Sequence, residues 1–378
     1  MNLLVDCSYI GESWKKSDSI FLYATRLIQG LKKYSQVNVV VLTWKDKEDL
    51  IDDMVGCQVD KIVVERKELT TRWRPYYRLT GFLPKKIKKE IKDRNITDVL
   101  LPFHCEVLFY FPHHIRHYAI AHDMLIYDMN QREKSPIRYY LWSKYQNFLT
   151  RKFTRLISIS CATHDEILSR IGIDSDILYN SIPFDFQKSE ECVEAVSGLS
   201  FILDVNRYDQ RKNPETLIRA LFLLRNKIPH ILYLKGEGDN GGFSSLRKLV
   251  YELGMQQRVI FDMKYRTEGE MRYLYTHAAL FVSPSLKEGF GWTPIEAAIL
   301  KTPVLVSDIE VFREVTCGKV TTFDPYSPED LAQHILDMLS NPPSIEKRTE
   351  ISEFFLERYS LKNQINQLIQ IIEHGSEQ

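Results

Sequence analysis

The feature that most constrains this chain is a regular alternation of short apolar runs with longer amphipathic stretches. Short apolar runs are typical of buried strands, and amphipathic stretches between them are typical of crossover helices. The alternation therefore predicts an α/β protein with parallel sheets covered by helices. Strands are expected at residues 2–6, 37–42, 60–64, 98–102, 118–121, 156–160, 201–205, 230–235, 258–261, 279–282, 303–307 and 320–323. Helices are expected between most of them, for instance at 19–33, 214–225, 268–277 and 328–339.

The length of 378 residues exceeds what one hydrophobic core usually serves, so two domains are expected. A polar stretch at 187–200 has few large apolar residues and lies midway, as a linker would. We expect one doubly wound, Rossmann-like domain over residues 1–186 and another over 187–358, facing an interdomain cleft. A C-terminal helix within 359–378 is expected to pack back on the first domain.

Composition excludes several classes of protein. Lysine plus arginine equals aspartate plus glutamate, at 50 each, so overall charge favours no class of partner. The six cysteines are scattered without the close pairs of a zinc site, which is typical of reduced thiols. The N-terminus lacks the basic start and long apolar region of a signal peptide, and no apolar run could span a bilayer. We therefore expect a cytoplasmic protein.

The segment 283–298, SPSLKEGFGWTPIEAA, contains the strongest functional pattern. An apolar strand leads through a glycine-containing turn into a helix for which Thr293 is the expected N-cap and Pro294 the first residue. This arrangement directs free N–H groups at one spot, which suits a phosphate. Glu296 could instead be only half of a capping box with Thr293. Glu288 precedes the turn and has no capping role, and this favours a ligand site.

This segment resembles the signature of family 4 retaining glycosyltransferases (glycosyl transferases group 1), which have the GT-B fold. The chain supplies that family's glutamates, Gly-Phe-Gly turn, small-residue pair and Pro-Val strand as Glu288, Gly289, Phe290, Gly291, Glu296, Ala297, Ala298, Pro303 and Val304. The resemblance implies a retaining, metal-independent enzyme that transfers a hexose-type sugar from a nucleotide-sugar donor. It further implies a glycan or lipid-linked acceptor and a role in bacterial surface polysaccharide assembly.

The resemblance also implies roles for particular residues. Arg207 and Lys212 stand where the family holds the donor diphosphate, and two cations near a helix N-terminus form a sound clamp. A solvated basic turn is the alternative. Glu288 is expected to contact the sugar near the reacting carbon, and Glu296 the ribose hydroxyls. The remaining donor-binding positions are Phe290, Gly291, Trp292, Thr293, Gly236, and Lys264, which lies where the family usually has a glycine near the nucleobase.

In the first half, His122 follows an apolar strand, where the family places a histidine near the donor sugar. We assign it a catalytic role and expect the nearby histidines, His117 among them, to be solvated in a loop. Gly11 is the acceptor-side candidate in the first loop. The pair Asp174 and Asp176 precedes a strand, so a solvated turn is expected rather than a metal site. No cofactor and no metal are expected.

Residues 61–94 form a basic block interleaved with aromatic residues. This mixture suits an anionic membrane surface, so peripheral association with the inner face of the membrane is expected. The alternative is a solvated helix with Ile87 and Ile91 facing the core. No nucleic-acid motif accompanies the block, and no nucleic-acid partner is expected.

Two other functions share this pattern. A nucleotide-sugar 2-epimerase of the same fold would process the donor without an acceptor. A non-catalytic nucleotide-binding scaffold would not need Glu288, Arg207 and Lys212, so the presence of all three argues against it.

Overall fold

A computed structural model describes residues 1–10, 19–65, 83–104, 111–112, 114–124, 144, 147–148, 150–182, 186, 188–237 and 242–374. The chain divides into two compact units. Unit 1 comprises Met1–Pro183 and Leu361–Gln378, and unit 2 comprises Phe184–Ser360. The stretch 187–200, expected to be a linker, belongs to unit 2, where Glu191 and Glu190 accept hydrogen bonds from Thr267 and Thr276.

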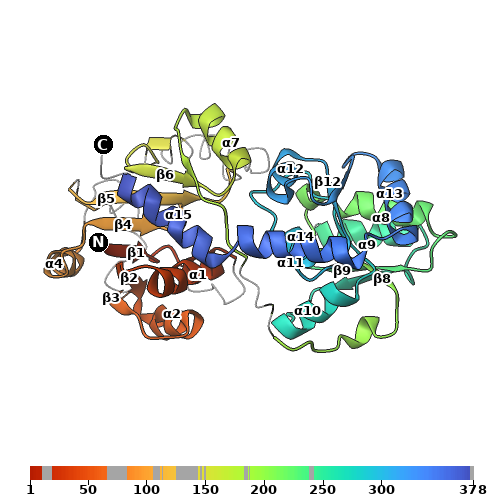
Figure 1. The fold of residues 1–378 in the computed structure, drawn as a ribbon, viewed down its shortest axis with the longest axis horizontal. Helices are drawn as coiled ribbons and strands as arrows, with labels where there is room; N and C mark the ends of the chain where they lie inside the picture. The colour runs from red at the N-terminus through yellow and green to blue at the C-terminus, as the bar shows by residue number, and fades with distance from the viewer. Residues whose placement is uncertain are drawn as a thin grey trace. The chain divides into compact units, whose positions relative to one another are not determined.

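Unit 1 contains a parallel sheet with the strand order β3-β2-β1-β4-β5-β6-β7 among its described residues. Its strands are β1 (Asn2–Asp6), β2 (Asn38–Trp44), β3 (Asp60–Val64), β4 (Asp98–Leu101), β5 (Arg116–Ala121), β6 (Arg155–Ser158) and β7 (Asp176–Ile177). Its helices are α1 (Ser19–Tyr34), η1 (Lys45–Lys47), α2 (Glu48–Val55), α4 (Lys85–Asp93), α7 (Cys161–Ile171) and α15 (Leu361–His374). The C-terminal helix α15 lies along α1, with Ile365 against Gly30 (Figure 1).

Unit 2 contains a second parallel sheet, with the order β10-β9-β8-β11-β12-β13 among its described residues. Its strands are β8 (Phe201–Val205), β9 (Ile231–Lys235), β10 (Val259–Asp262), β11 (Leu280–Ser283), β12 (Val304–Ser307) and β13 (Thr321–Phe323). Its helices are η5 (Glu194–Val196), η6 (Gln210–Lys212), α8 (Pro214–Leu223), α9 (Gly242–Glu252), α10 (Glu268–His277), α11 (Trp292–Ile299), α12 (Glu310–Thr316), α13 (Pro328–Ser340) and α14 (Ile345–Arg358).

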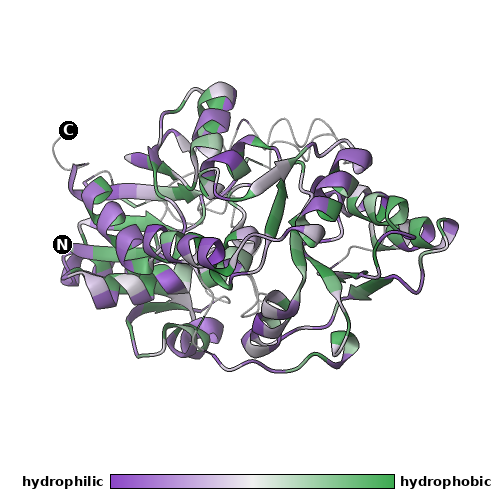
Figure 2. Ribbon diagram, turned by 45° about the vertical axis from the view of Figure 1, so that its right-hand side comes forward, coloured by the Kyte–Doolittle hydropathy of each residue, from purple (hydrophilic) through white to green (hydrophobic). Residues whose placement is uncertain are grey.

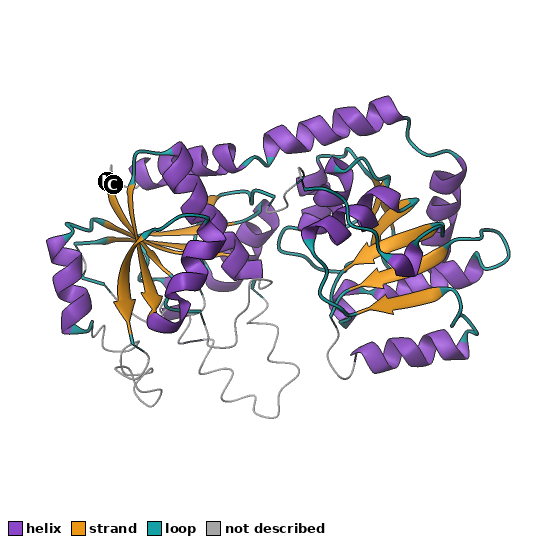
Figure 3. Ribbon diagram, turned by 90° about the horizontal axis from the view of Figure 1, so that it is seen from below, coloured by secondary structure: helices purple, strands orange, loops and turns teal. Residues whose placement is uncertain are grey.

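Each sheet is buried because helices lie on both of its sides (Figure 3). In unit 1, α4 and α7 contribute isoleucines to a core formed with the central strands. In unit 2, α8, α9 and α13 cover one face of the sheet, while α10, α11 and α14 pack together. The strands are accordingly apolar, and the helices present polar residues outward (Figure 2). The expected α/β architecture is confirmed.

Strand order reverses once in each unit, between β1 and β4 in unit 1 and between β8 and β11 in unit 2. At such a switch point the loops after the two strands diverge and leave a crevice for ligands at the carboxyl ends. The loops after β8 and β11 contain Lys212 and Glu288. The sheet topology therefore brings two of the expected site residues to one place.

Two local predictions were wrong. His117 lies within β5 and is buried, rather than solvated in a loop, because strand β5 begins two residues earlier than its apolar run suggests. Helix α11 begins at Trp292, not after Thr293. Among the described residues, no helix is long and apolar enough to cross a membrane.

Candidate active site

Lys212 and Glu288 form an ion pair at the switch point of unit 2. The Lys212 Nζ atom lies 2.5 Å from Glu288 Oε1, and the two side chains are only 13% and 10% exposed. They are 76 residues apart in the sequence, so only the fold joins them. A largely buried ion pair is stronger than an exposed one, because water screens it less. Lys212 is therefore not part of a solvated turn.

Local backbone structure fixes where Lys212 lies. The Asp209 side chain caps the short helix η6 by accepting a hydrogen bond from the Lys212 backbone N–H. Pro214 then starts α8 at a position where its missing N–H costs nothing. The loop after β11 is tied to η6, because the Leu286 N–H donates to the Arg211 carbonyl at 2.8 Å. The two loops that carry Lys212 and Glu288 are thus hydrogen-bonded to each other.

A buried carboxyl lies close to this pair. Asp204, near the end of β8, is 1% exposed and accepts a hydrogen bond from Asn206. Burial raises the pKa of Asp204 to about 7, while hydrogen bonding to Asn206 and the nearby Lys212 lower it. Sequence reasoning missed Asp204, although a carboxyl at the end of an apolar strand is a usable signal.

Arg207 differs from Lys212 in its surroundings. Its side chain is exposed, and it makes no ion pair or hydrogen bond with the described residues. The structure therefore places Arg207 on the same loop as Lys212 but does not pair the two cations around one carboxylate. An exposed guanidinium at this edge is available to an incoming anion.

Glu296 is not a capping residue. Gly291, with a left-handed φ of 90°, is the N-cap of α11 and provides no side chain, so the expected capping box is absent. Glu296 instead accepts a hydrogen bond from the buried Tyr275 hydroxyl at 2.7 Å. Burial raises the pKa of Glu296 to about 7, against the lowering effect of Tyr275. The alternative that Glu296 only completes a capping box with Thr293 is therefore wrong.

The other expected donor-binding residues lie around the same edge. Phe290 is buried with its ring edge-on to Tyr359 at 5.3 Å, so its side chain packs in the core. Trp292 has a buried Nε1 atom without a hydrogen-bond partner among the described residues. Thr293 is the second residue of α11. Lys264 is exposed after β10.

Gly236 follows β9 where two backbone segments cross. A Cβ atom there would overlap the carbonyl oxygen of Asn206. The Gly236 N–H donates to the Asp262 carbonyl at 2.9 Å, and the Asn206 N–H donates to the Lys235 carbonyl at 3.0 Å. Glycine at this position therefore keeps the ends of β8, β9 and β10 close together.

In unit 1, His122 follows β5 at the carboxyl edge of the sheet. Its Nε2 atom lies 2.8 Å from the Pro102 carbonyl oxygen, and its ring packs edge-on to Tyr23. Burial lowers the pKa of His122 to about 4, so the ring is neutral at pH 7. Because a carbonyl only accepts, Nε2 must carry the proton, and Nδ1 is then an acceptor.

Two buried groups at the switch point of unit 1 were missed. His104 follows β4, and burial lowers its pKa to about 3. Asp6 ends β1, and burial raises its pKa to about 6. Both stand after strands at the carboxyl edge, which is the signal that could have identified them.

Several expectations lie outside the described residues: Gly11, and the part of the basic block from 66 to 82. Asp176 lies in β7 beside Arg155, and Asp174 is exposed. Among the described residues, no group of three or more His, Cys, Asp or Glu side chains could hold a metal ion.

Residues 186–355 match the family model described as Glycosyl transferases group 1. This segment is similar to that family, in agreement with the resemblance found in the sequence. The matched residues coincide with nearly all of unit 2 and include Lys212, Glu288 and Glu296.

Several curated glycosyltransferases are similar to part of the chain. The O-antigen chain mannosyltransferase RfbU of Salmonella typhimurium is 25% identical over 216 residues, which cover 56% of this chain and 58% of that protein. The O-antigen chain mannosyltransferase B of Escherichia coli is 25% identical over 249 residues, 62% of this chain and 64% of that protein. The chain thus spans less than two thirds of the length of these relatives.

Solved structures are similar over nearly the whole chain. A sucrose-phosphate synthase from Thermosynechococcus elongatus has a TM-score of 0.70 at 15% identity, covering 99% of both chains. HepE from Anabaena, in complex with UDP and glucose, has a TM-score of 0.70 at 14% identity, covering 99% of this chain and all of that one. These likenesses show the fold, which is the expected GT-B fold.

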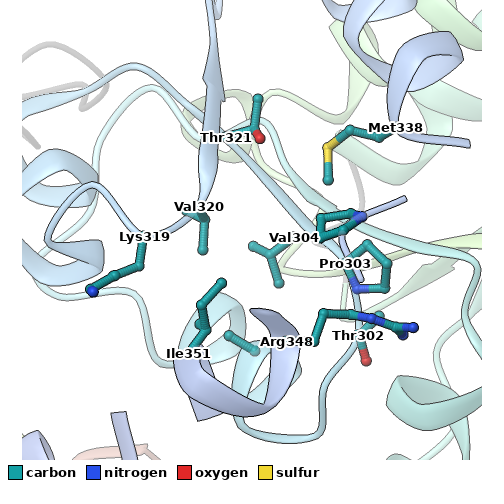
Figure 4. Close-up of a pocket in the computed structure, with 11 residues that line it drawn as sticks. Thr302, Pro303, Val304, Lys319, Val320, Thr321, Met338, Arg348 and Ile351 are labelled. Atoms are coloured by element: carbon teal, nitrogen blue, oxygen red, sulfur yellow. The ribbon is translucent and has the colours of Figure 1, made fainter. Parts of the chain in front are cut away.

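A pocket in unit 2 lies away from the Lys212–Glu288 ion pair. It has a volume of about 40 Å³ and lies between the starts of β12 and β13 and helix α14. Figure 4 shows Val304, Val320 and Ile351 around its centre, with the charged ends of Lys319 and Arg348 directed to opposite sides. Because strands β12 and β13 are parallel, this pocket is at the amino edge of the sheet, opposite Lys212 and Glu288.

Proposed function

We propose that this protein is a retaining glycosyltransferase that moves a hexose-type sugar from a nucleotide-sugar donor to a glycan or lipid-linked acceptor. The observation that carries the proposal is the Lys212–Glu288 ion pair at the switch point of unit 2. A cation suited to phosphate and a carboxylate suited to sugar hydroxyls lie side by side there, at an edge where parallel sheets bind ligands. The match of residues 186–355 to the family model and the names of the O-antigen mannosyltransferases support the reaction class and a place in surface polysaccharide assembly.

In the proposed reaction, the cationic residues bind the diphosphate and the carboxylates bind the sugar and the ribose. Lys212 and Arg207 stabilise the negative charge that develops on the leaving diphosphate, assisted by N–H groups at the start of α11. Glu288 accepts a hydrogen bond from the sugar and stabilises the oxocarbenium-like transition state. Glu296 holds the ribose hydroxyls. HepE, which was solved with UDP and glucose, supports a nucleotide-sugar as the donor.

We propose that no metal ion is needed, since Lys212, Arg207 and the helix N-terminus supply positive charge for the diphosphate. Activity in excess EDTA should equal activity without it. A loss on chelation that magnesium or manganese restores would contradict this part of the proposal.

His122 is proposed to contact the transferred sugar. Because its Nε2 proton is committed to the Pro102 carbonyl, Nδ1 would accept a hydrogen bond from a sugar hydroxyl. The basic helix α4 is proposed to bind an anionic membrane surface, which would bring the protein to lipid-linked acceptors.

The deciding experiment is a ligand screen by thermal unfolding. UDP-glucose, UDP-galactose, GDP-mannose and ADP-glucose should be compared, and one is expected to raise the Tm clearly above the others, because a ligand bound to the folded state stabilises it. The protecting donor then serves in turnover assays that measure nucleoside diphosphate release. NMR of the product should show the anomeric configuration of the donor. Inversion of configuration would contradict the retaining mechanism.

A further inference from the structure

The orientation of Glu288 depends on a second contact besides Lys212. The Ser285 hydroxyl donates a hydrogen bond to Glu288 Oε1 at 2.7 Å, and Lys212 Nζ contacts the same oxygen at 2.5 Å. The other carboxylate oxygen, Oε2, makes no hydrogen bond or ion pair with the described residues. One oxygen of Glu288 is thus held by two donors, and the other can still accept a hydrogen bond.

Ser285 is itself fixed by the adjacent strand. It is fully buried, two residues after the end of β11. Ser307, fully buried at the end of β12, donates from its hydroxyl to the Ser285 carbonyl oxygen. Strands β11 and β12 pair in parallel, with Ser283 beside Val306, so both serines stand on a rigid part of the sheet. Ser307 therefore fixes the backbone of Ser285, and the Ser285 hydroxyl holds the carboxylate.

We infer that Ser285 is a positioning residue that orients Glu288, and that Ser307 supports it. The inference rests on the proposed function, in which Glu288 contacts the sugar. Lys212 alone would hold Glu288 less firmly, because in the proposed reaction its ammonium group also contacts the diphosphate. The neutral Ser285 hydroxyl has no such second task. It keeps Oε1 occupied, so that Oε2 is the oxygen that accepts from the sugar.

Ser285→Ala tests this inference in two backgrounds. In the wild-type background, kcat for nucleotide release should fall about tenfold, while the Kd of the protecting nucleotide-sugar changes less than about twofold. In the Glu288→Gln background, Ser285→Ala should lower kcat no further. The effects of two substitutions do not add when one residue acts through the other, whereas the effect of a general loss of packing would add to that of Glu288→Gln.

Ser352→Ala provides the matched control. Ser352 is also buried in unit 2 and donates to a carbonyl oxygen of α11, that of Ile299, at 2.6 Å. The Ser352→Ala variant therefore loses a comparable buried hydrogen bond that does not involve Glu288. Its kcat should match that of the wild type. Ser307→Ala should show a smaller loss than Ser285→Ala, with the same lack of additivity.

The outcomes separate this inference from the proposed function. Normal turnover in Glu288→Gln would overturn the role of Glu288 itself. A strongly impaired Glu288→Gln beside a normal Ser285→Ala would overturn only the positioning role, as would equal losses in both backgrounds. Should Ser285→Ala fail to fold, Ser285→Cys keeps the shape with a weaker donor. Its kcat should then lie below the wild type, and a wild-type value would overturn the inference.

Discussion

At the residue scale, Lys212 contacts one anion in the structure and would contact a second in the proposed reaction. Its ammonium group already contacts Glu288, and the buried Asp204 lies close enough to interact with it. An arriving diphosphate would add further negative charge to the same place. Since an ammonium group has three N–H donors, Lys212 can bridge Glu288 and a phosphate at once. Such a bridge would set the distance between the carboxylate and the leaving group.

Replacing either cation should slow turnover. Lys212→Ala and Arg207→Ala are each expected to reduce kcat by about 10²-fold or more, the scale of losing one contact to developing charge. Arg219→Ala, on the exposed side of α8, is the control and should be nearly normal. Turnover measured with the protecting donor checks the prediction. Near-normal rates in both variants, with the fold intact, would rule out the clamp.

Glu296 should show opposite effects on stability and on donor binding. Its folded pKa, about 7, lies above the ordinary value of 4.5, so the folded state binds the proton more tightly. This contribution to stability is therefore present at low pH and is lost as pH rises towards 7. Glu296→Gln removes the carboxyl but can still accept from Tyr275.

The variant Glu296→Gln should thus be more stable than the wild type at pH 8, by roughly 1–3 kcal/mol, since one pKa unit corresponds to about 1.4 kcal/mol. At pH 4 the difference should vanish. Donor affinity at pH 8 should fall, because an amide is a poorer acceptor for ribose hydroxyls. Denaturant unfolding at both pH values and calorimetric titration of the donor measure the two effects. Unchanged affinity would remove Glu296 from the donor site.

Sequence alone could not pair Lys212 with Glu288, because no local pattern joins residues 76 positions apart. It could not reveal that Ser285 holds Glu288, since serine after a strand is ordinary turn composition. Asp204 was overlooked for a related reason. Its importance comes from burial beside Lys212, which only the folded sheet creates.

At the element scale, the strands of unit 2 were predictable because they are buried on both faces and therefore apolar throughout. Strand β8 was located to the residue. The start of α11 was not, because the glycine turn runs directly into the helix and a left-handed Gly291 takes the cap position from Thr293. Helix starts without a side-chain cap leave no signal for sequence reasoning.

Gly236 links the ends of three strands, so its replacement should disturb the whole carboxyl edge. In Gly236→Ala, the added methyl would overlap the Asn206 carbonyl oxygen, and the backbone must move because neither group is flexible. We expect a Tm several degrees lower and donor binding weakened at least tenfold. Glu237→Ala, at the adjacent exposed position, should leave both unchanged. Thermal unfolding and donor titration measure the two effects. A Tm and a donor affinity equal to those of the wild type would contradict the close approach of Gly236 to Asn206.

At the scale of the whole molecule, zero formal net charge conceals an uneven distribution. Helix α4 buries Ile87 and Ile91. It exposes five lysines: Lys85, Lys86, Lys88, Lys89 and Lys92. This arrangement fits the solvated-helix alternative as well as membrane binding, since either requires isoleucines inward and lysines outward. The sequence could therefore predict the helix and its faces but not its partner.

Vesicle binding distinguishes a membrane-bound helix α4 from a solvated one. If α4 docks on a bilayer, the protein should sediment with vesicles of phosphatidylcholine and phosphatidylglycerol and be released by salt, because exposed charges are screened within about 8 Å at physiological ionic strength. Replacing Lys85 and Lys86 by glutamine should weaken binding about 30-fold, at about 1 kcal/mol per charge. Replacing the exposed Lys227 and Lys248 of unit 2 is the control and should have little effect. Equal sedimentation with pure phosphatidylcholine, or none with either vesicle, would leave α4 as a solvated helix and favour a soluble acceptor.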